Sequence, residues 1–157
     1  MRHVAEVRRI IVREWLHYIA DLNRTMREHE EEIERCKAKL DLASMDYSRV
    51  MVTTSPEPDA MLKAVALLEE ARQDYATVIA EYEQELQEAW EICHRAGLPE
   101  CSMLWDHHVE RMTWAQVGKK YNYAAKYADE KAAQGIDAIY DALPDRTVRQ
   151  VWKEMEG

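Results

Sequence analysis

Apolar residues recur at alternating steps of four and three along the first half of the chain. The first run comprises Trp15, Ile19, Leu22, Met26, His29, Ile33, Cys36 and Leu40. The second run comprises Met61, Val65, Leu68, Arg72, Tyr75, Ile79, Tyr82, Leu86, Ala89 and Cys93. This spacing places each run on one stripe of an amphipathic helix. Because neither helix can bury its stripe alone in water, the pattern predicts an antiparallel, coiled-coil-like hairpin with helices of about 30 residues each.

A proline-containing segment, TTSPEPDA, separates the two runs. Proline cannot sit inside a helix without breaking it, so Pro56 and Pro58 mark the connection, and Asp59 suits the cap of the second helix. The sequence therefore predicts a hairpin over residues 1–95 with a connection at about 44–59. An apolar run ahead of the first stripe either extends the first helix or forms a short separate one: Val4, Val7, Ile11.

A second boundary falls between residues 96 and 99, where Gly97 suits a helix C-cap and Pro99 the first position of a new helix. Beyond it, the pattern predicts a domain over residues 98–157 with four shorter helices. These helices cover about residues 100–110, 113–121, 124–143 and 145–156, with Pro144 ending the third. Thr113 and Gln116 have the spacing of a capping box at the start of the second.

A short capped helix, a three-residue turn at Tyr121–Tyr123 and a longer helix form a helix-turn-helix arrangement. Gly118 in the first of these helices lets another backbone approach closely. The residues spaced to pack between the two helices are Val117, Tyr121, Tyr123, Ala128 and Ile136; those that would roof the pair are Leu104, Val109 and Met112. The expected fold is therefore all-α, a long helical hairpin followed by a small helix-turn-helix domain.

Composition supports this fold and limits the function. Four glycines and four prolines are too few for a strand-rich fold with many turns. The net charge is -9, with -7 in residues 1–95 and -2 in residues 96–157, so neither part is a basic domain. Three cysteines, no recognisable signal peptide and no run of about 18 apolar residues indicate a reduced, cytoplasmic protein with free thiols and no membrane span.

The stretch MTWAQVGKKYNYAAKYADEKAAQGIDAIYDAL resembles region 4 of bacterial sigma factors, in which a threonine-capped helix precedes the recognition helix. The whole layout, a charged hairpin with a proline-interrupted middle followed by this module, is similar to small phage-encoded regulators of the RinA and ArpU type. The likeness covers nearly the whole chain and is sharpest over residues 104–143. It implies binding of double-stranded DNA in the control of late phage or prophage transcription. Our first hypothesis is therefore a phage-type transcriptional regulator, in which the acidic hairpin forms a homodimer or contacts RNA polymerase.

The resemblance also implies which residues meet the DNA. By position, the residues that enter the major groove are Ala124, Ala125, Lys126, Tyr127, Asp129, Glu130 and Lys131. Thr113 and Trp114 would approach the phosphate backbone, where helix N-terminal amides favour anions, and Lys119 and Lys120 would add phosphate contacts. This sequence departs from the sigma pattern because no arginine lies between Thr113 and Leu143. A glutamate such as Glu130 can accept a hydrogen bond from cytosine N4.

The alternative is a protein-interaction module that keeps this fold without contacting bases, with the hairpin as a scaffold that binds RNA polymerase or another host protein. Catalysis and cofactors are not expected, since no nucleophile elbow, phosphate loop, dinucleotide fingerprint or HExxH motif occurs. The spacing of Cys93, His94, Cys101, His107 and His108 matches no strong zinc pattern, so no metal is expected. No small-molecule substrate is expected either.

Overall fold

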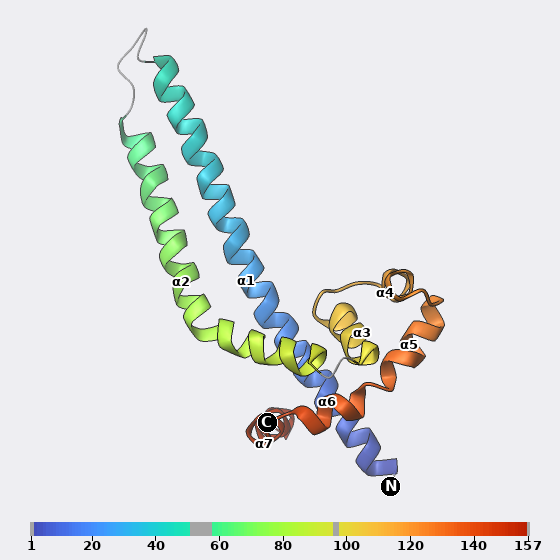
Figure 1. The fold of residues 1–157 in the computed structure, drawn as a ribbon. Coiled ribbons are helices and arrows are strands. Elements are labelled where there is room, and N and C mark those ends of the chain that lie inside the picture. Colours follow the sequence, from blue (N-terminus) through green and yellow to red (C-terminus); the bar gives the residue numbers. More distant parts are fainter. Residues whose placement is uncertain (1, 51–57, 96–97, 157) are drawn as a thin grey trace. The chain divides into compact units, whose positions relative to one another are not determined.

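The computed structural model of the protein describes residues 2–50, 58–95 and 98–156 (Figure 1). Within these ranges the chain forms seven α-helices and no strand, which confirms the all-α fold class. The helices are α1 (Arg2–Val50), α2 (Pro58–His94), α3 (Pro99–His108), α4 (Trp114–Tyr121), α5 (Ala125–Ala133), α6 (Ile136–Ala142) and α7 (Asp145–Glu156). Among the described helices, none is both long enough and apolar enough to cross a membrane.

The two long helices exceed the expected length, with 49 residues in α1 and 37 in α2. The apolar run before the first stripe extends α1, because that helix is continuous from Arg2. The connection was expected to begin at about residue 44, but α1 continues to Val50. No proline or glycine before Pro56 is present in the sequence to end this helix earlier. The expected cap at Asp59 is wrong, because α2 begins at Pro58 and Asp59 lies inside its first turn, where its negative charge still favours the helix N-terminus. The expected roles of Pro56 and Gly97 lie outside the described residues.

The helices form two compact units. We call residues 24–84 the hairpin unit, and residues 1–23 together with 85–157 the composite unit. These units do not follow the expected division into residues 1–95 and 98–157, because the first turns of α1 and the end of α2 pack with the C-terminal helices. For example, the Tyr18 hydroxyl donates a hydrogen bond to Glu85 at 3.1 Å inside the composite unit. The domain boundary at residues 96–98 stays a prediction.

In the hairpin unit, α1 and α2 pack side by side in opposite directions (Figure 1). Their contact includes a cluster of Cys36, Leu68 and Ala71, with Ile33 and Leu40 against it. A cross-helix hydrogen bond from the Tyr75 hydroxyl to Glu30 spans 2.8 Å.

The α2 stripe differs from the expected one by a single residue in its first turns. Val65 and Arg72 were expected to face α1, but both are exposed. Ala64 and Ala71 are buried instead. The two positions lie one residue before the expected ones, and both carry small side chains. At residues 64 and 65 periodicity alone could not separate the two registers, because alanine and valine both count as apolar, whereas the charge of Arg72 already favoured Ala71 as the buried position.

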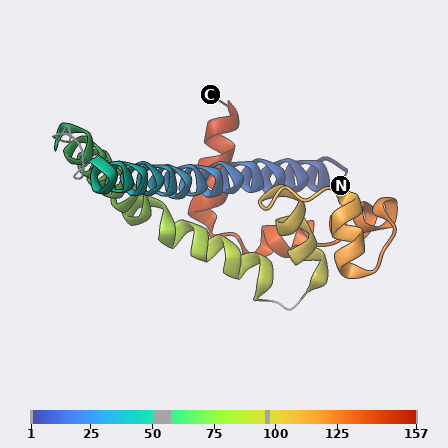
Figure 2. The same cartoon turned by 90° about the horizontal axis from the view of Figure 1, so that it is seen from above.

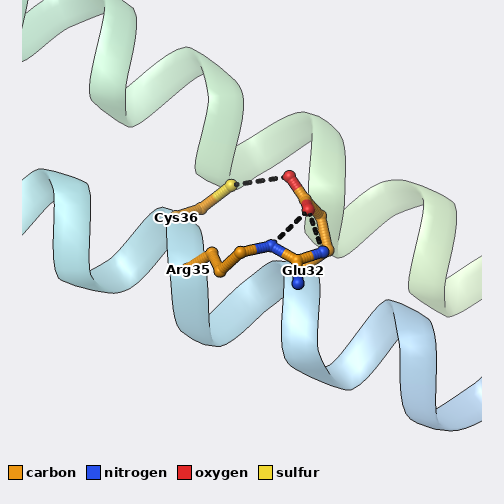
Figure 3. A network of polar contacts seen from close by, with 3 residues as sticks. All are labelled: Glu32, Arg35 and Cys36. Atoms are coloured by element: carbon orange, nitrogen blue, oxygen red, sulfur yellow. Dashed lines mark hydrogen bonds and ion pairs between the residues drawn. The ribbon is translucent and has the colours of Figure 1, made fainter.

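A polar network lies on α1 beside this cluster (Figure 3). The Glu32 carboxylate accepts a hydrogen bond from Arg35 Nε at 2.9 Å and one from the Cys36 thiol at 3.6 Å. Burial, with the nearby Glu32 carboxylate, raises the pKa of Cys36 above its ordinary value. The thiol is therefore protonated at neutral pH and acts as a small apolar side chain in the helix contact.

In the composite unit, one face of α1 is almost completely covered. On this face Ile11, Val12, Leu16 and Ile19 are all buried. Other buried apolar residues of the same unit include Cys93 of α2 and Cys101 and Met103 of α3. The first turns of α1 also meet α6 (Figure 2), where Arg8 makes an ion pair with Asp137 at 3.8 Å and lies over the Tyr140 ring. The N-terminal turns of α1 are therefore a structural part of the C-terminal module.

The expected single helix over residues 124–143 is wrong, because the chain breaks between α5 and α6 at Gln134 and Gly135. The Gly135 amide donates to the Ala132 carbonyl at 2.9 Å, which tightens the last turn of α5. A side chain at Gly135 would place its Cβ 2.9 Å from the Cys101 backbone nitrogen. The glycine thus lets the bend between α5 and α6 sit directly against the start of α3.

Candidate nucleic-acid interface

The start of α4 is fixed by a capping box, as the sequence predicts. Thr113 has an extended backbone, and its hydroxyl accepts a hydrogen bond from the Gln116 amide at 3.1 Å. The Gln116 side chain accepts one from the Thr113 amide at 2.9 Å. Two backbone donors at the helix start are satisfied reciprocally, so the register of α4 is set by these two residues.

The turn between α4 and α5 is tight and has a left-handed residue at its centre. Asn122 has φ 65°, a conformation that asparagine tolerates better than most residues. The amides of Asn122 and Tyr123 both donate to the Gly118 carbonyl, the second at 2.7 Å. A Cβ on Gly118 would lie 2.3 Å from the Tyr123 carbonyl oxygen, so only glycine allows this approach. The expected role of Gly118 is confirmed.

A buried carboxylate ties α3 to α4. Asp106 is only 5% exposed, yet its Oδ2 accepts hydrogen bonds from Lys120 Nζ at 2.9 Å and from the Tyr121 hydroxyl at 2.8 Å. Burial and this hydrogen bond raise the pKa of Tyr121 well above its ordinary value, which keeps the hydroxyl a donor. Sequence reasoning missed Asp106, because nothing in its local pattern distinguishes it from a surface acid.

The leading face of α5 is open to solvent in the composite unit. Val117 and Ala128 are fully buried, as expected for residues between α4 and α5. The residues that turn outward at the start of α5 are Ala124, Ala125, Lys126, Tyr127, Asp129 and Glu130. Tyr127 is 49% exposed although it contacts the Tyr123 ring. Six of the residues expected to enter the major groove are therefore accessible together.

Two of the expected lysines already have partners. Lys131 lies 3.3 Å from Glu100 of α3 and is only 27% exposed. This pairing raises the pKa of Lys131, and a backbone hydrogen bond together with the lysine lowers the pKa of Glu100. Lys120 is bound to Asp106, although its side chain is 53% exposed. In contrast, Lys119 and Lys126 are exposed and make no ion pair in the described part of the chain.

Trp114, expected near the phosphate backbone, is half-buried and stacks on His107 with ring centroids 3.8 Å apart. His107 Nδ1 donates to the Met112 carbonyl at 2.8 Å, which orients this ring. His108 follows in the chain, and its ring lies 5.9 Å from that of His17 on α1. Burial, with His107, His17 and Arg13 nearby, lowers the pKa of His108 to about 4. His108 is therefore neutral at pH 7. Trp114, in contrast to the expected phosphate contact, is held in place by its stacking on His107.

The chain between α3 and α4 contains a second left-handed residue. Arg111 has φ 58°, and its side chain is exposed and makes no ion pair among the described residues. A non-glycine residue in this conformation costs about 1–2 kcal/mol. The Met112 amide donates to the Asp106 carbonyl at 3.0 Å, so the sharp bend brings the chain back onto α3 before α4 begins.

In the described ranges, no three His, Cys, Asp or Glu residues converge in a way that could hold a metal ion. Cys93 and Cys101 are free and buried, and burial raises the pKa of Cys93 to about 12 and that of Cys101 in the same direction. These thiols are protonated at neutral pH.

Comparison of the chain with protein-family models, with curated proteins and with solved structures gave no match. The case for a function therefore depends on the geometry and the sequence pattern of this chain alone.

Proposed function

We propose that this protein is a DNA-binding transcriptional regulator of the phage or prophage type, which reads DNA with α4 and α5. One observation carries the proposal: a capped helix, a tight left-handed turn and a helix with an exposed leading face occur in sequence. This is the arrangement that places a recognition helix in the major groove. The likeness of this stretch to region 4 of sigma factors supports the same function.

The side chains of α5 suit close approach to base edges. Ala124 and Ala125 are small and exposed at the helix start, so the backbone can enter the groove deeply. Lys126 and Glu130 follow on one exposed face, four residues apart. Lys126 can donate to guanine O6 and N7, and Glu130 can accept from cytosine N4.

The charge of the interface limits how tightly it binds. Only Lys119 and Lys126 among the expected lysines carry no ion pair in the described residues, and Asp129 and Glu130 oppose them. Since phosphate neutralisation supplies most of non-specific affinity, this surface binds random DNA weakly. We propose that pairing of two chains through the hairpin, or contact of the hairpin with RNA polymerase, adds the missing affinity and places the protein on its operator.

The second candidate is a protein-interaction module with the same fold, in which α5 contacts a host protein such as RNA polymerase and not DNA. The observation in its favour is the acidic pair at Asp129 and Glu130 beside the exposed ring of Tyr127. Exposed aromatic side chains are common anchors in protein interfaces, while acidic residues repel phosphates.

A fluorescence titration separates the two candidates. The purified full chain is titrated against the duplex upstream of its neighbouring operon at several salt concentrations, with and without RNA polymerase. For a DNA-binding regulator, we expect an affinity that falls steeply with salt and is lost in Lys126→Glu. Lys63→Glu is a matched control, because Lys63 is exposed on the hairpin unit and makes no ion pair in the described residues. No binding at low salt, with or without polymerase, would refute DNA recognition and favour the protein-interaction module.

A further inference from the structure

Two arginines of α1 are free for a partner. Arg9 and Arg13 lie one helical turn apart, both are exposed, and neither makes a hydrogen bond or ion pair in the described part of the chain. Their neighbour Arg8 differs, since it is bound to Asp137 and lies over Tyr140. Arg8 therefore stabilises the contact between α1 and α6. Arg9 and Arg13 have no ion-pair partner among the described residues.

The two unpaired arginines face the helix-turn-helix. Together with Trp114 of α4 and Asp129 and Ala133 of α5, they line a hollow of about 250 Å³. Trp114 is the first residue of α4, so the arginines stand beside the end of α4 that approaches phosphate in a helix-turn-helix. Asp129 belongs to the exposed leading part of α5. All of these residues belong to the composite unit, so their placement depends on one packed core.

The electrostatics of this hollow favour an anion. Arg9 and Arg13 supply two positive charges, and Asp129 is the only acidic residue among its lining residues, with no ion pair to either arginine. His108 also lines the hollow, but its low pKa keeps it neutral at pH 7. A guanidinium binds phosphate oxygens through two parallel hydrogen bonds, and such contacts are stronger than those of a lysine.

We propose that the first turns of α1 are part of the DNA interface, with Arg9 and Arg13 binding backbone phosphates beside the groove that α5 enters. This inference rests on the proposed function and adds the contact that α4 and α5 lack, because no arginine lies between Thr113 and Leu143. The sequence alone does not indicate this contact, since Arg9 and Arg13 precede Thr113 by about a hundred residues and lie in the segment predicted to form the hairpin. The tertiary fold of the composite unit brings them to one hollow with residues of α3, α4 and α5.

The test compares charge-matched variants of the full chain. Binding to a fluorescein-labelled duplex, selected by the wild-type protein from a random library, is measured between about 50 and 200 mM NaCl. Neutralising two phosphate contacts in Arg9→Gln/Arg13→Gln should make the slope of log K against log salt shallower by about 2 without changing the preferred sequence. Lys39→Gln/Lys63→Gln removes the same charge from exposed positions of the hairpin unit that make no ion pair in the described residues, and it should leave the slope unchanged.

Two further variants keep the inference and the proposed function distinguishable. Arg9→Lys/Arg13→Lys retains the charges and should restore most of the slope, which a mere loss of folding would not allow. If Lys126→Glu abolishes binding while Arg9→Gln/Arg13→Gln keeps the wild-type slope, the arginine contact is refuted and the helix-turn-helix function stands. If the arginine variant alone changes the slope and Lys126→Glu binds normally, α1 binds phosphate and the proposed mode of α5 is refuted. A wild-type selection that yields no bound duplex overturns both.

Discussion

Gly118→Ala tests whether the turn between α4 and α5 has the geometry of a helix-turn-helix. In an ordinary helix interior, replacing glycine by alanine stabilises a protein by about 1 kcal/mol, because alanine loses less backbone entropy. Here the new Cβ would lie 2.3 Å from the Tyr123 carbonyl oxygen. That oxygen belongs to the backbone of the turn, so it cannot retreat as the end of a flexible side chain would.

The cost follows from the required displacement. Real Cβ contacts are essentially never shorter than 3.0 Å, so the turn must move by at least 0.7 Å. This movement strains the hydrogen bond from the Tyr123 amide to the Gly118 carbonyl, now 2.7 Å, which is worth about 1 kcal/mol. Overpacking by the new methyl group costs a further ~1–3 kcal/mol, about 1 kcal/mol of which is offset by the higher helix propensity of alanine. The net expectation is a loss of about 2 kcal/mol, or about 4–8 °C in Tm for a chain of this size.

Thermal and urea unfolding monitored by circular dichroism measure this loss. Gly135→Ala is the graded control, because its Cβ would lie 2.9 Å from the nearest backbone atoms and needs a smaller shift. We expect Gly118→Ala to destabilise the protein more than Gly135→Ala does. A Gly118→Ala protein that is as stable as the wild type, or more stable, would show that α4 and the turn do not approach this closely.

Three further substitutions test other parts of the same module. Arg111→Gly should stabilise the protein by about 0.5–1 kcal/mol in urea unfolding, because glycine adopts φ 58° without strain; a loss of stability would contradict the left-handed bend. Asp106→Ala should cost about 2–3 kcal/mol in the same assay, since it leaves the Tyr121 hydroxyl without its buried acceptor, and an effect below about 0.5 kcal/mol would deny the link between α3 and α4. His108 has a folded-state pKa of about 4, below the ordinary value of 6.5, so the folded state binds fewer protons than the unfolded one. The contribution of neutral His108 to the free energy of unfolding is fully present above pH 6.5 and decreases by about 2 kcal/mol as the pH falls towards 4. His108→Gln should therefore flatten the plot of unfolding free energy against pH between 6.5 and 4. An unchanged plot would exclude His108 as the cause of the decrease.

The helices were predictable where the sequence marks their ends. Thr113 and Gln116 define the start of α4 through their spacing, and Pro144 separates α6 from α7. Gly118 could be assigned a close backbone contact because glycine weakens a short helix and is favoured beside a turn where another backbone approaches. These signals are local, so they depend on a few neighbouring residues and not on the rest of the fold.

The features that escaped sequence reasoning depend on packing between distant segments. Gly135 was expected inside one helix, and its contact with the start of α3 accounts for the bend there. The pairing of Lys131 with Glu100 follows from how α5 lies on α3, which periodicity does not encode. Arg9 and Arg13 reach the helix-turn-helix through the tertiary fold, and no sequence motif connects them to it.

The central claim is that the exposed face of α5 reads bases, and selection of duplexes from a random library by the full chain tests it most directly. We predict that the wild-type protein enriches one sequence motif, and that Glu130→Gln changes the preferred base at a single position from cytosine to adenine. Glu130 is exposed and makes no ion pair in the described residues, so this substitution leaves the fold intact. Absence of any enriched motif, or an identical motif for both proteins, would contradict the claim.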